Sequence, residues 1–166
     1  MARGKIAEKD VDKLKRAFGG VRNYLLVLMG LSLFVTILCL RNYRGEDAFL
    51  WIAMFTGLLG SSTTALISGL NRNANGYEDV AGNVSSDFDK DKERFNNGME
   101  EWFICRPWLG VITSALAYWA VIGGVVGSQV DLNPEKIAVW GMMAGLFAKN
   151  LLDIFRNLLK SVFQKG

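Results

Sequence analysis

Apolar residues gather in four long blocks along the chain instead of recurring as amphipathic stripes. The blocks cover residues 23–40, 48–70 and 107–128, and a fourth stretch that starts near Ile137. Each offers roughly the 20 residues that an α-helix needs to cross a hydrocarbon core of about 30 Å. Helices are expected because lipid provides no partner for the unpaired N–H and C=O groups of an open strand. The pattern predicts an all-α, polytopic membrane protein with four transmembrane helices arranged as two hairpins.

The polar stretches between the blocks divide the chain into five parts. They are a cytoplasmic amphipathic segment (1–22), transmembrane hairpin 1 (23–70), a cytoplasmic loop with a helix (71–106), transmembrane hairpin 2 (107–160) and a cytoplasmic tail (161–166). The first segment can place its apolar residues on one face and its lysines on the other. Those apolar residues are Ile6, Val11, Leu14, Phe18 and Val21. That helix either lies on anionic lipid or packs on its neighbours in an oligomer.

Two further features are expected in the polar parts. Gly19 and Gly20 offer a joint between the first amphipathic helix and the membrane. In the central loop, an amphipathic helix is expected from Ser85 or Ser86, because a Ser cap is followed by acidic residues. Its apolar residues at helical spacing would be Phe88, Phe95, Met99 and Trp102. A further amphipathic helix is expected at the C-terminus.

Basic residues predict the orientation of the chain. Sixteen of the 19 Lys and Arg residues lie before the first block, around the central loop or near the C-terminal end. The other three are Arg41, Arg44 and Lys136, in the two short turns. Because cytoplasmic loops carry the excess of Lys and Arg, both termini and the 71–106 loop are expected in the cytoplasm. The expected localisation is therefore a multi-pass membrane protein.

Small residues four positions apart predict close helix packing. Such spacing lets the backbones of two membrane helices approach one another. The glycines that carry this prediction are Gly57, Gly60, Gly123, Gly124 and Gly127. An alternative is that glycine is simply common in membrane helices.

The two hairpins also resemble each other in sequence. Setting Arg22 on Arg106 aligns RNYLLVL with RPWLGVI, and setting Gly57 on Gly145 aligns GLLGSS with GLFAKN. The offsets of 84 and 88 residues nearly agree, which favours a parallel duplication. Chance alignment of short apolar segments is the alternative.

Polar residues inside the apolar blocks are the candidate functional positions. They are Lys149, Asn150, Asp153 and Arg156 in the fourth block and Ser61, Ser62 and Thr64 in the second. If the fourth helix enters at Ile137, Lys149 lies about 18 Å deep and about 12 Å from the inner boundary. A charge near the bilayer centre costs about 2.5–3.5 kcal/mol.

Three arrangements relieve this cost. The fourth helix breaks near Gly145, so that residues 149–164 lie along the inner surface. A continuous helix instead turns its polar face toward a water-filled path shared by several subunits. In the third arrangement, Lys149 pairs with Asp153 and is buried against residues 61–64.

Several kinds of chemistry lack support in the sequence. Histidine is absent, only two Cys are present, and the DFDKDKERFNNGMEE run fails the calcium-loop pattern in both registers. The net charge of +3 and the lack of a compact basic face argue against nucleic-acid binding. We therefore expect no enzyme activity, no metal and no cofactor.

The stretches RPWLG and GLFAKNLLD resemble paired signatures of uncharacterised prokaryotic multi-span membrane domains. Arg106, Pro107 and Gly110 match an Arg-Pro-x-x-Gly span start, and Gly145 matches the next motif. Ala148 and Lys149 stand where that motif has Ser and Glu, and Phe147 is displaced. The resemblance covers only the second hairpin, and it implies a membrane domain without a catalytic role.

Two functions remain open at this stage. A polar fourth helix beside a hydroxyl-rich second helix favours a homo-oligomer, with an ion-conducting pore lined by the fourth helix. The alternative is a non-conducting scaffold in the bilayer that shapes the membrane or docks a cytosolic protein partner through residues 71–106. A small carrier has less support, because no block is clearly interrupted at mid-depth around a substrate site.

Overall fold

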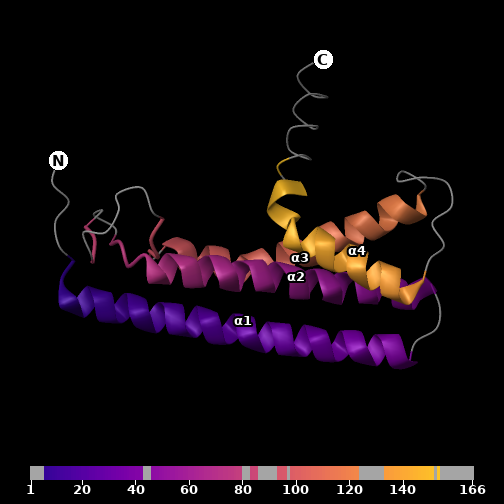
Figure 1. Cartoon of the computed structure of the whole chain (residues 1–166), viewed down its shortest axis with the longest axis horizontal. Coiled ribbons are helices and arrows are strands. Elements are labelled where there is room, and N and C mark those ends of the chain that lie inside the picture. Colours follow the sequence, from indigo (N-terminus) through magenta and orange to yellow (C-terminus); the bar gives the residue numbers. More distant parts are fainter. Residues whose placement is uncertain are drawn as a thin grey trace, which may run out of the picture.

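The computed structural model describes residues 6–42, 46–79, 83–85, 93–96, 98–123, 133–151 and 153. These residues form four helices: α1 (Glu8–Asn42), α2 (Glu46–Ala74), α3 (Gly98–Ile122) and α4 (Pro134–Leu146). The helices lie side by side in an elongated bundle (Figure 1). The described part of the chain contains no strand, so the all-helical prediction is confirmed.

α1 is one continuous helix of 35 residues, about 52 Å long at 1.5 Å per residue. It passes through Gly19 and Gly20, so the expected joint is absent. The predicted apolar face is the buried one, with Leu14, Phe18 and Val21 inside the molecule. Because this face packs within the same chain, it is not free to lie on lipid.

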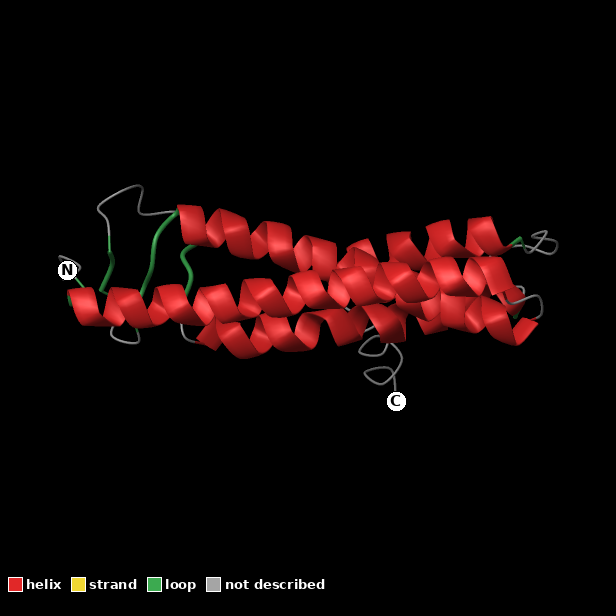
Figure 2. Cartoon of the chain, turned by 90° about the horizontal axis from the view of Figure 1, so that it is seen from below, coloured by secondary structure: helices red, strands yellow, loops and turns green. Residues whose placement is uncertain are grey.

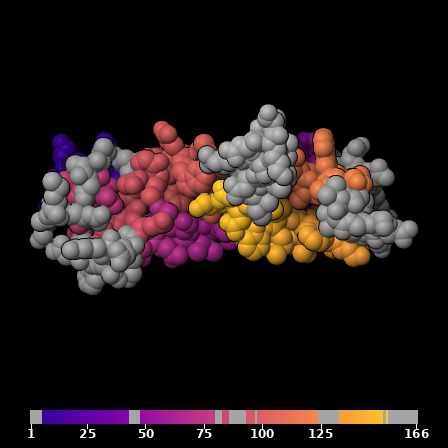
Figure 3. All heavy atoms as spheres, turned by 90° about the horizontal axis from the view of Figure 1, so that it is seen from above, coloured from indigo at the N-terminus to yellow at the C-terminus, as the bar shows by residue number. Residues whose placement is uncertain are grey.

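α2 lies at the centre of the bundle and packs against the other three helices. It runs antiparallel to α1, since Phe18 meets Gly69 at one end while Cys39 and Ala48 line a common pocket at the other. α4 runs parallel to α2, because Gly141 meets Ala53 and Gly145 meets Gly57. Figure 3 shows the face formed by α2, α3 and α4, with α1 largely hidden behind them.

Residues 93–96 of the central loop are extended, not helical as expected, whereas Phe88 and the rest of residues 86–92 lie outside the described part of the chain. Phe95 pairs with Tyr77, and Val84 pairs with Glu78, in isolated β-bridges. The Phe95 N–H donates to the Gly76 carbonyl at 3.1 Å, and the Glu78 N–H donates to the Phe95 carbonyl at 3.0 Å. These bonds occupy the backbone groups that a helix would use, and α3 begins only at Gly98. The described loop residues gather at the end of the bundle where α1 begins (Figure 2).

α3 runs through the position at which the third block was expected to begin. Pro107, favourable as the first residue of a helix, instead lies inside α3 and is fully buried. Proline has no N–H, so the Phe103 carbonyl loses its usual partner in the helix. The helix that contains the third apolar block therefore begins before Pro107, at Gly98.

α4 begins with a clear signal and ends with a bend. The Asn133 side chain accepts from the Glu135 N–H at 2.8 Å, and Pro134 occupies the first turn. α4 is 13 residues long, about 20 Å. At Phe147 the helix is interrupted, and the ribbon turns away from the bundle (Figure 1).

Only α1, α2 and α3 are long and apolar enough to cross a membrane among the described residues. α4 is shorter than a span, and the C-terminal helix expected beyond residue 153 lies outside the described residues. These findings support a membrane protein, whereas the four-span layout and the orientation remain proposals.

The exposed surface of α1 changes character along its length. In residues 8–23, every exposed side chain is charged or polar, apart from one glycine. In residues 26–40, every exposed residue is apolar, again apart from one glycine. The exposed surface of the same helix is therefore polar along one half and apolar along the other. We call residues 8–23, together with Tyr77, Val84, Phe95 and Phe103, the polar-end module.

Candidate functional site

Three helices meet most closely around Gly57 of α2. A Cβ added at Gly57 would overlap the Ser114 side chain of α3, and one added at Gly145 would overlap the Gly57 backbone. A Cβ at Gly110 would likewise overlap Ser61. We call Gly57, Gly110, Gly141 and Gly145 the glycine crossing. Only glycine allows the three backbones to approach this closely.

Hydroxyl groups link the helices across this crossing. Ser61 donates to the Arg106 carbonyl at 2.8 Å, joining α2 to α3. Ser114 donates to the Gly141 carbonyl at 2.9 Å, joining α3 to α4. Small residues and hydroxyl bonds are the means by which helices associate in lipid, where burying apolar surface brings no gain.

Thr113 acts at the point where α4 ends. Its hydroxyl donates to the Ala144 carbonyl at 3.3 Å, as well as to carbonyls of its own helix. In a regular helix, the Ala144 carbonyl would accept a hydrogen bond from the N–H of residue 148. A side chain that inserts into the hydrogen-bond ladder of a helix is a known cause of bends. The interruption of α4 follows at Phe147.

Among the described residues, the helices are in direct contact at the level of Gly57. Glycine backbones and serine side chains fill the contact between α2, α3 and α4. Ser61, Ser62 and Thr113 are all buried there. Ser61 and Thr113 of this interior bond to a neighbouring helix.

The predicted hydroxyl residues of α2 lie inside the bundle. Ser61 bonds α3, as described above, and Thr64 donates back to the carbonyls of Gly60 and Ser61 at 3.1 Å. The buried Ser62 hydroxyl has no hydrogen-bond partner among the described residues. None of the three takes part in a described bond with a charged side chain of the fourth block.

The predicted packing glycines have different surroundings. Gly57 belongs to the crossing, and Gly60 lies against the α4 backbone at Met142. Gly123 is exposed at the end of α3, and a Cβ there would meet only Trp119 of the same helix. Gly124 and Gly127 lie outside the described residues.

The polar residues of the fourth block lie beyond the bend. Lys149, Asn150 and Asp153 are exposed, and Arg156 lies outside the described residues. Lys149 and Asp153 are not buried against α2, so the third expected arrangement does not occur. The interruption at Phe147 corresponds to the first arrangement, although the course of residues 154–164 is not described.

Packing also defines the level of Lys149 along the bundle. Phe18 of α1 faces Gly69 of α2. Because the two helices are antiparallel, Leu26, eight residues after Phe18, lies at the same height along the bundle axis as Ser61, eight residues before Gly69. Gly145 contacts Gly57 in the parallel α2–α4 pair, so Lys149 is close to the level of Ser61 as well. Lys149 therefore lies near Leu26, where the exposed surface of α1 becomes apolar.

Two of the residue pairs that the internal repeat equates are in contact. The Trp108 indole N–H donates to the Tyr24 hydroxyl at 3.1 Å, and these two residues are 84 positions apart. Gly145 contacts Gly57, its equivalent at the offset of 88. Tyr24 also lies between the polar and the apolar half of α1, a level at which Tyr and Trp are enriched in membrane proteins.

An aromatic cluster forms the core of the polar-end module. Phe95 is fully buried at its centre, with ring centroids 5.4 Å from Phe18, 6.4 Å from Tyr77 and 6.1 Å from Phe103. The rings come from α1, the central loop and α3. The loop is thus fixed against the helices by its own aromatic side chains.

Polar contacts also connect the same loop to the end of α2. Arg72, near the end of α2, pairs with Glu93 and also donates to the Met99 sulfur at 2.7 Å. Tyr77 donates its hydroxyl to the Asn73 side chain. Burial raises the pKa of the Tyr77 phenol, which therefore stays neutral at physiological pH.

Sequence reasoning missed several residues of these contacts. Gly110 and Ser114 are four positions apart, as are Gly141 and Gly145, so the spacing rule applied to Gly57 and Ser61 would also have found them. Phe103 carried no such signal, because it lies in a stretch with many large apolar residues. Within the described ranges, no group of three or more His, Cys, Asp or Glu side chains is arranged to hold a metal ion.

Comparisons with known proteins returned nothing for this chain. No family model, curated protein or solved structure matches it. A function must therefore be inferred from its geometry.

Proposed function

We propose that this chain is a multi-span membrane protein acting as a non-conducting scaffold, which presents the polar-end module to a cytosolic protein. The observation that carries the proposal is the continuity of α1. One unbroken helix joins an apolar-surfaced half to a polar-surfaced half with its own aromatic core. A rigid connection of this kind suits a protein that holds a docking module at a fixed height above the bilayer.

The membrane boundary would lie near Tyr24. Between Arg22 and Arg41 the helix carries no charged residue over about 27 Å, close to the thickness of a hydrocarbon core. Lys149, close to the level of Leu26, would then be about 6 Å from the level of Arg22. A lysine side chain reaches that far toward the headgroups. This depth is smaller than the 12 Å expected from the sequence.

The excess of Lys and Arg around the module supports a cytoplasmic location for it and for both termini. The segment beyond Phe147, with Lys149, Asn150 and Asp153 exposed, would leave the bundle at the inner boundary. In this proposal, α4 enters the bilayer from outside beside α2 and completes the second hairpin.

Closure of the bundle interior supports the absence of conduction through one chain. At the glycine crossing, the three backbones leave no room even for a methyl group. After its first turn, which exposes Glu135 and Lys136, the exposed large side chains of α4 are apolar: Val139, Trp140, Met142 and Met143. A helix with this surface suits contact with lipid better than contact with water.

Site-specific photocrosslinking in cells tests the scaffold. A benzophenone amino acid replacing Lys13, exposed on the polar-end module, should capture one cytosolic protein reproducibly. The same group replacing Leu33, exposed on the apolar half, should not capture it. Phe95→Ala should abolish capture from position 13, because the core of the module is lost, whereas Phe34→Ala should not. Equal capture from positions 13 and 33 would contradict the proposal.

A pore formed by several chains is the second candidate. It is favoured by the exposure of Lys149, Asn150 and Asp153, three polar residues that no described bond engages. Purified protein in planar bilayers decides between the candidates. The scaffold predicts no current, whereas a pore predicts currents whose ion selectivity changes in Lys149→Glu and Asp153→Lys.

A further inference from the structure

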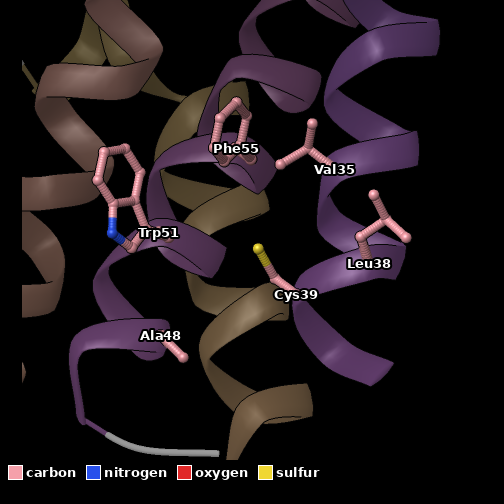
Figure 4. Close-up of a pocket in the computed structure, with 6 residues that line it drawn as sticks. All are labelled: Val35, Leu38, Cys39, Ala48, Trp51 and Phe55. Carbon is pink, nitrogen blue, oxygen red and sulfur yellow. The ribbon is translucent and has the colours of Figure 1, made fainter. Parts of the chain in front are cut away.

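A pocket of about 320 Å³ opens between α1 and α2 at the end of the bundle away from the polar-end module. Its lining residues are Val35, Leu38 and Cys39 from α1 and Ala48, Trp51 and Phe55 from α2. Figure 4 shows the Cys39 sulfur pointing into the space between the two helices, with the Trp51 and Phe55 rings on the α2 side. Cavities of this size hold small ligands in other proteins.

The chemistry of the walls selects an apolar occupant. No lining residue carries a charge. The Trp51 and Phe55 rings stack with centroids 6.2 Å apart and form one continuous aromatic wall. The Cys39 thiol is buried, and such a thiol behaves as a small hydrophobic group.

Polar residues follow the pocket in sequence near one of its ends. The exposed residues Arg41 and Asn42 follow Cys39 within one turn, and α2 begins at Glu46, just before Ala48. From Ala48 to Phe55 the slot extends along the helix for about 10 Å. Its sides carry Leu38 and Trp51, 38% and 53% exposed, which belong to the apolar outer surface of the bundle. The slot is therefore continuous with the surface that would face lipid.

We propose that this pocket holds one acyl chain of a phospholipid, whose phosphate stays beside Arg41. A slot with apolar walls, an open side on the apolar surface and an exposed basic residue, Arg41, two positions after Cys39 matches the two chemical parts of such a lipid. The proposal rests on the membrane embedding stated above and is independent of the scaffold role.

Photolabelling with lipids tests the pocket. The full-length protein is reconstituted in phosphatidylcholine and phosphatidylglycerol vesicles whose lipids carry a diazirine at mid-chain. After irradiation, mass spectrometry of peptides compares labelling at Cys39 and Trp51 with labelling at Ile112 and Leu116, which are exposed on α3. We expect severalfold more label at the pocket than on α3.

Two variants separate the pocket from general lipid contact. Ala48→Leu fills the slot and should lower labelling at Cys39 and Trp51 severalfold, with labelling on α3 unchanged. Gly30→Leu adds comparable bulk at an exposed position of α1 with open space around it. It should change neither the labelling at the pocket nor the labelling on α3. The labelling ratio of the unmodified protein decides the question if Ala48→Leu does not fold.

Three results overturn the proposal. Equal labelling of all exposed apolar positions means general lipid contact without a specific binding site. Labelling by a small diazirine-bearing hydrocarbon but not by the phospholipid means a pocket for free apolar molecules. Unchanged labelling in a folded Ala48→Leu variant means that the chain lies elsewhere. Label on α1 and α3 but none near Lys13 would still support the embedding, so the two proposals fail separately.

Discussion

The two halves of α1 bury and expose opposite chemistry. Residues 8–23 expose charges, and the buried positions from Leu14 to Leu25 are all large and apolar. Residues 26–40 expose apolar side chains, and their buried positions are Ser32, Thr36 and Cys39. One helix thus buries large apolar side chains under a polar surface along one half, and small, mostly hydroxyl-bearing side chains under an apolar surface along the other.

This inversion follows from what surrounds each half. In water, burying Phe18 removes apolar surface from solvent, so large side chains move inward. In lipid that gain is absent, and close backbone approach with hydroxyl bonds holds the helices together. The periodicity of α1 therefore identifies its buried face, whereas the chemistry of the opposite face identifies the solvent.

The strongest test of the comparison removes the core of the polar half. Phe95→Ala should destabilise the polar-end module by about 3–5 kcal/mol, because a fully buried ring is lost. Hydrogen exchange of residues 77–96 in nanodiscs measures this loss. Phe34→Ala is the control, since Phe34 is 60% exposed on the apolar half. An equal effect of both variants would contradict the inversion.

A charge placed on each half tests the surfaces directly. Leu33→Arg, in the middle of the apolar surface, should cost about 2.5–3.5 kcal/mol of insertion free energy. Gly20→Arg, exposed on the polar half with open space around it, should cost little. Insertion of both variants into microsomes, assayed by glycosylation mapping, measures the difference. Equal insertion would mean that residues 26–40 do not meet lipid.

The packing of the apolar interior is tested at the glycine crossing. Gly57→Val should cost about 1–3 kcal/mol, because its side chain overlaps Ser114 and no flexible neighbour yields. Thermal unfolding in detergent measures the loss. Gly30→Val is the matched control on α1, where a Cβ meets nothing within 4 Å. If both variants unfold at the same temperature, the three helices are not in close contact.

The smallest expected effect concerns a single hydroxyl bond. Ser114→Ala removes the bond to the Gly141 carbonyl and should cost about 0.6 kcal/mol, the average for such bonds in membrane proteins. The same thermal measurement on Ser85→Ala, which removes the hydroxyl that accepts from the Tyr77 N–H at 2.9 Å in the loop, gives the comparison from the polar end. A loss above about 2 kcal/mol at Ser114 would show that hydroxyls contribute more to the apolar interior than we infer.

Sequence patterns predicted the features that depend on local chemistry. The buried face of α1, with Leu14, Phe18 and Val21, follows from the helical spacing of large apolar residues. The apolar blocks predicted the helices that are long enough to cross a membrane. Both signals lie within one segment and need no information about its neighbours.

Features set by packing between segments were not predictable in the same way. Phe95 fits a helical pattern with Met99 and Trp102, yet its backbone pairs with Gly76 and Glu78, which lie 17 or more residues earlier. The level of Lys149 depends on the contact between Gly145 and Gly57, which sets how far α4 slides along α2. The depth predicted from the sequence was counted from Ile137 alone and could not include that contact.

α1 is unbroken through Gly19 and Gly20, so its polar half must tilt together with its apolar half. When a bilayer becomes thinner, membrane helices accommodate the mismatch by tilting. A tilt change of about 10° would displace a point about 25 Å beyond the boundary by about 4 Å, because no joint absorbs the rotation. The orientation of a rigid spin label at position 9, in aligned bilayers of different chain length, would measure how far bilayer thickness tilts this end of the protein.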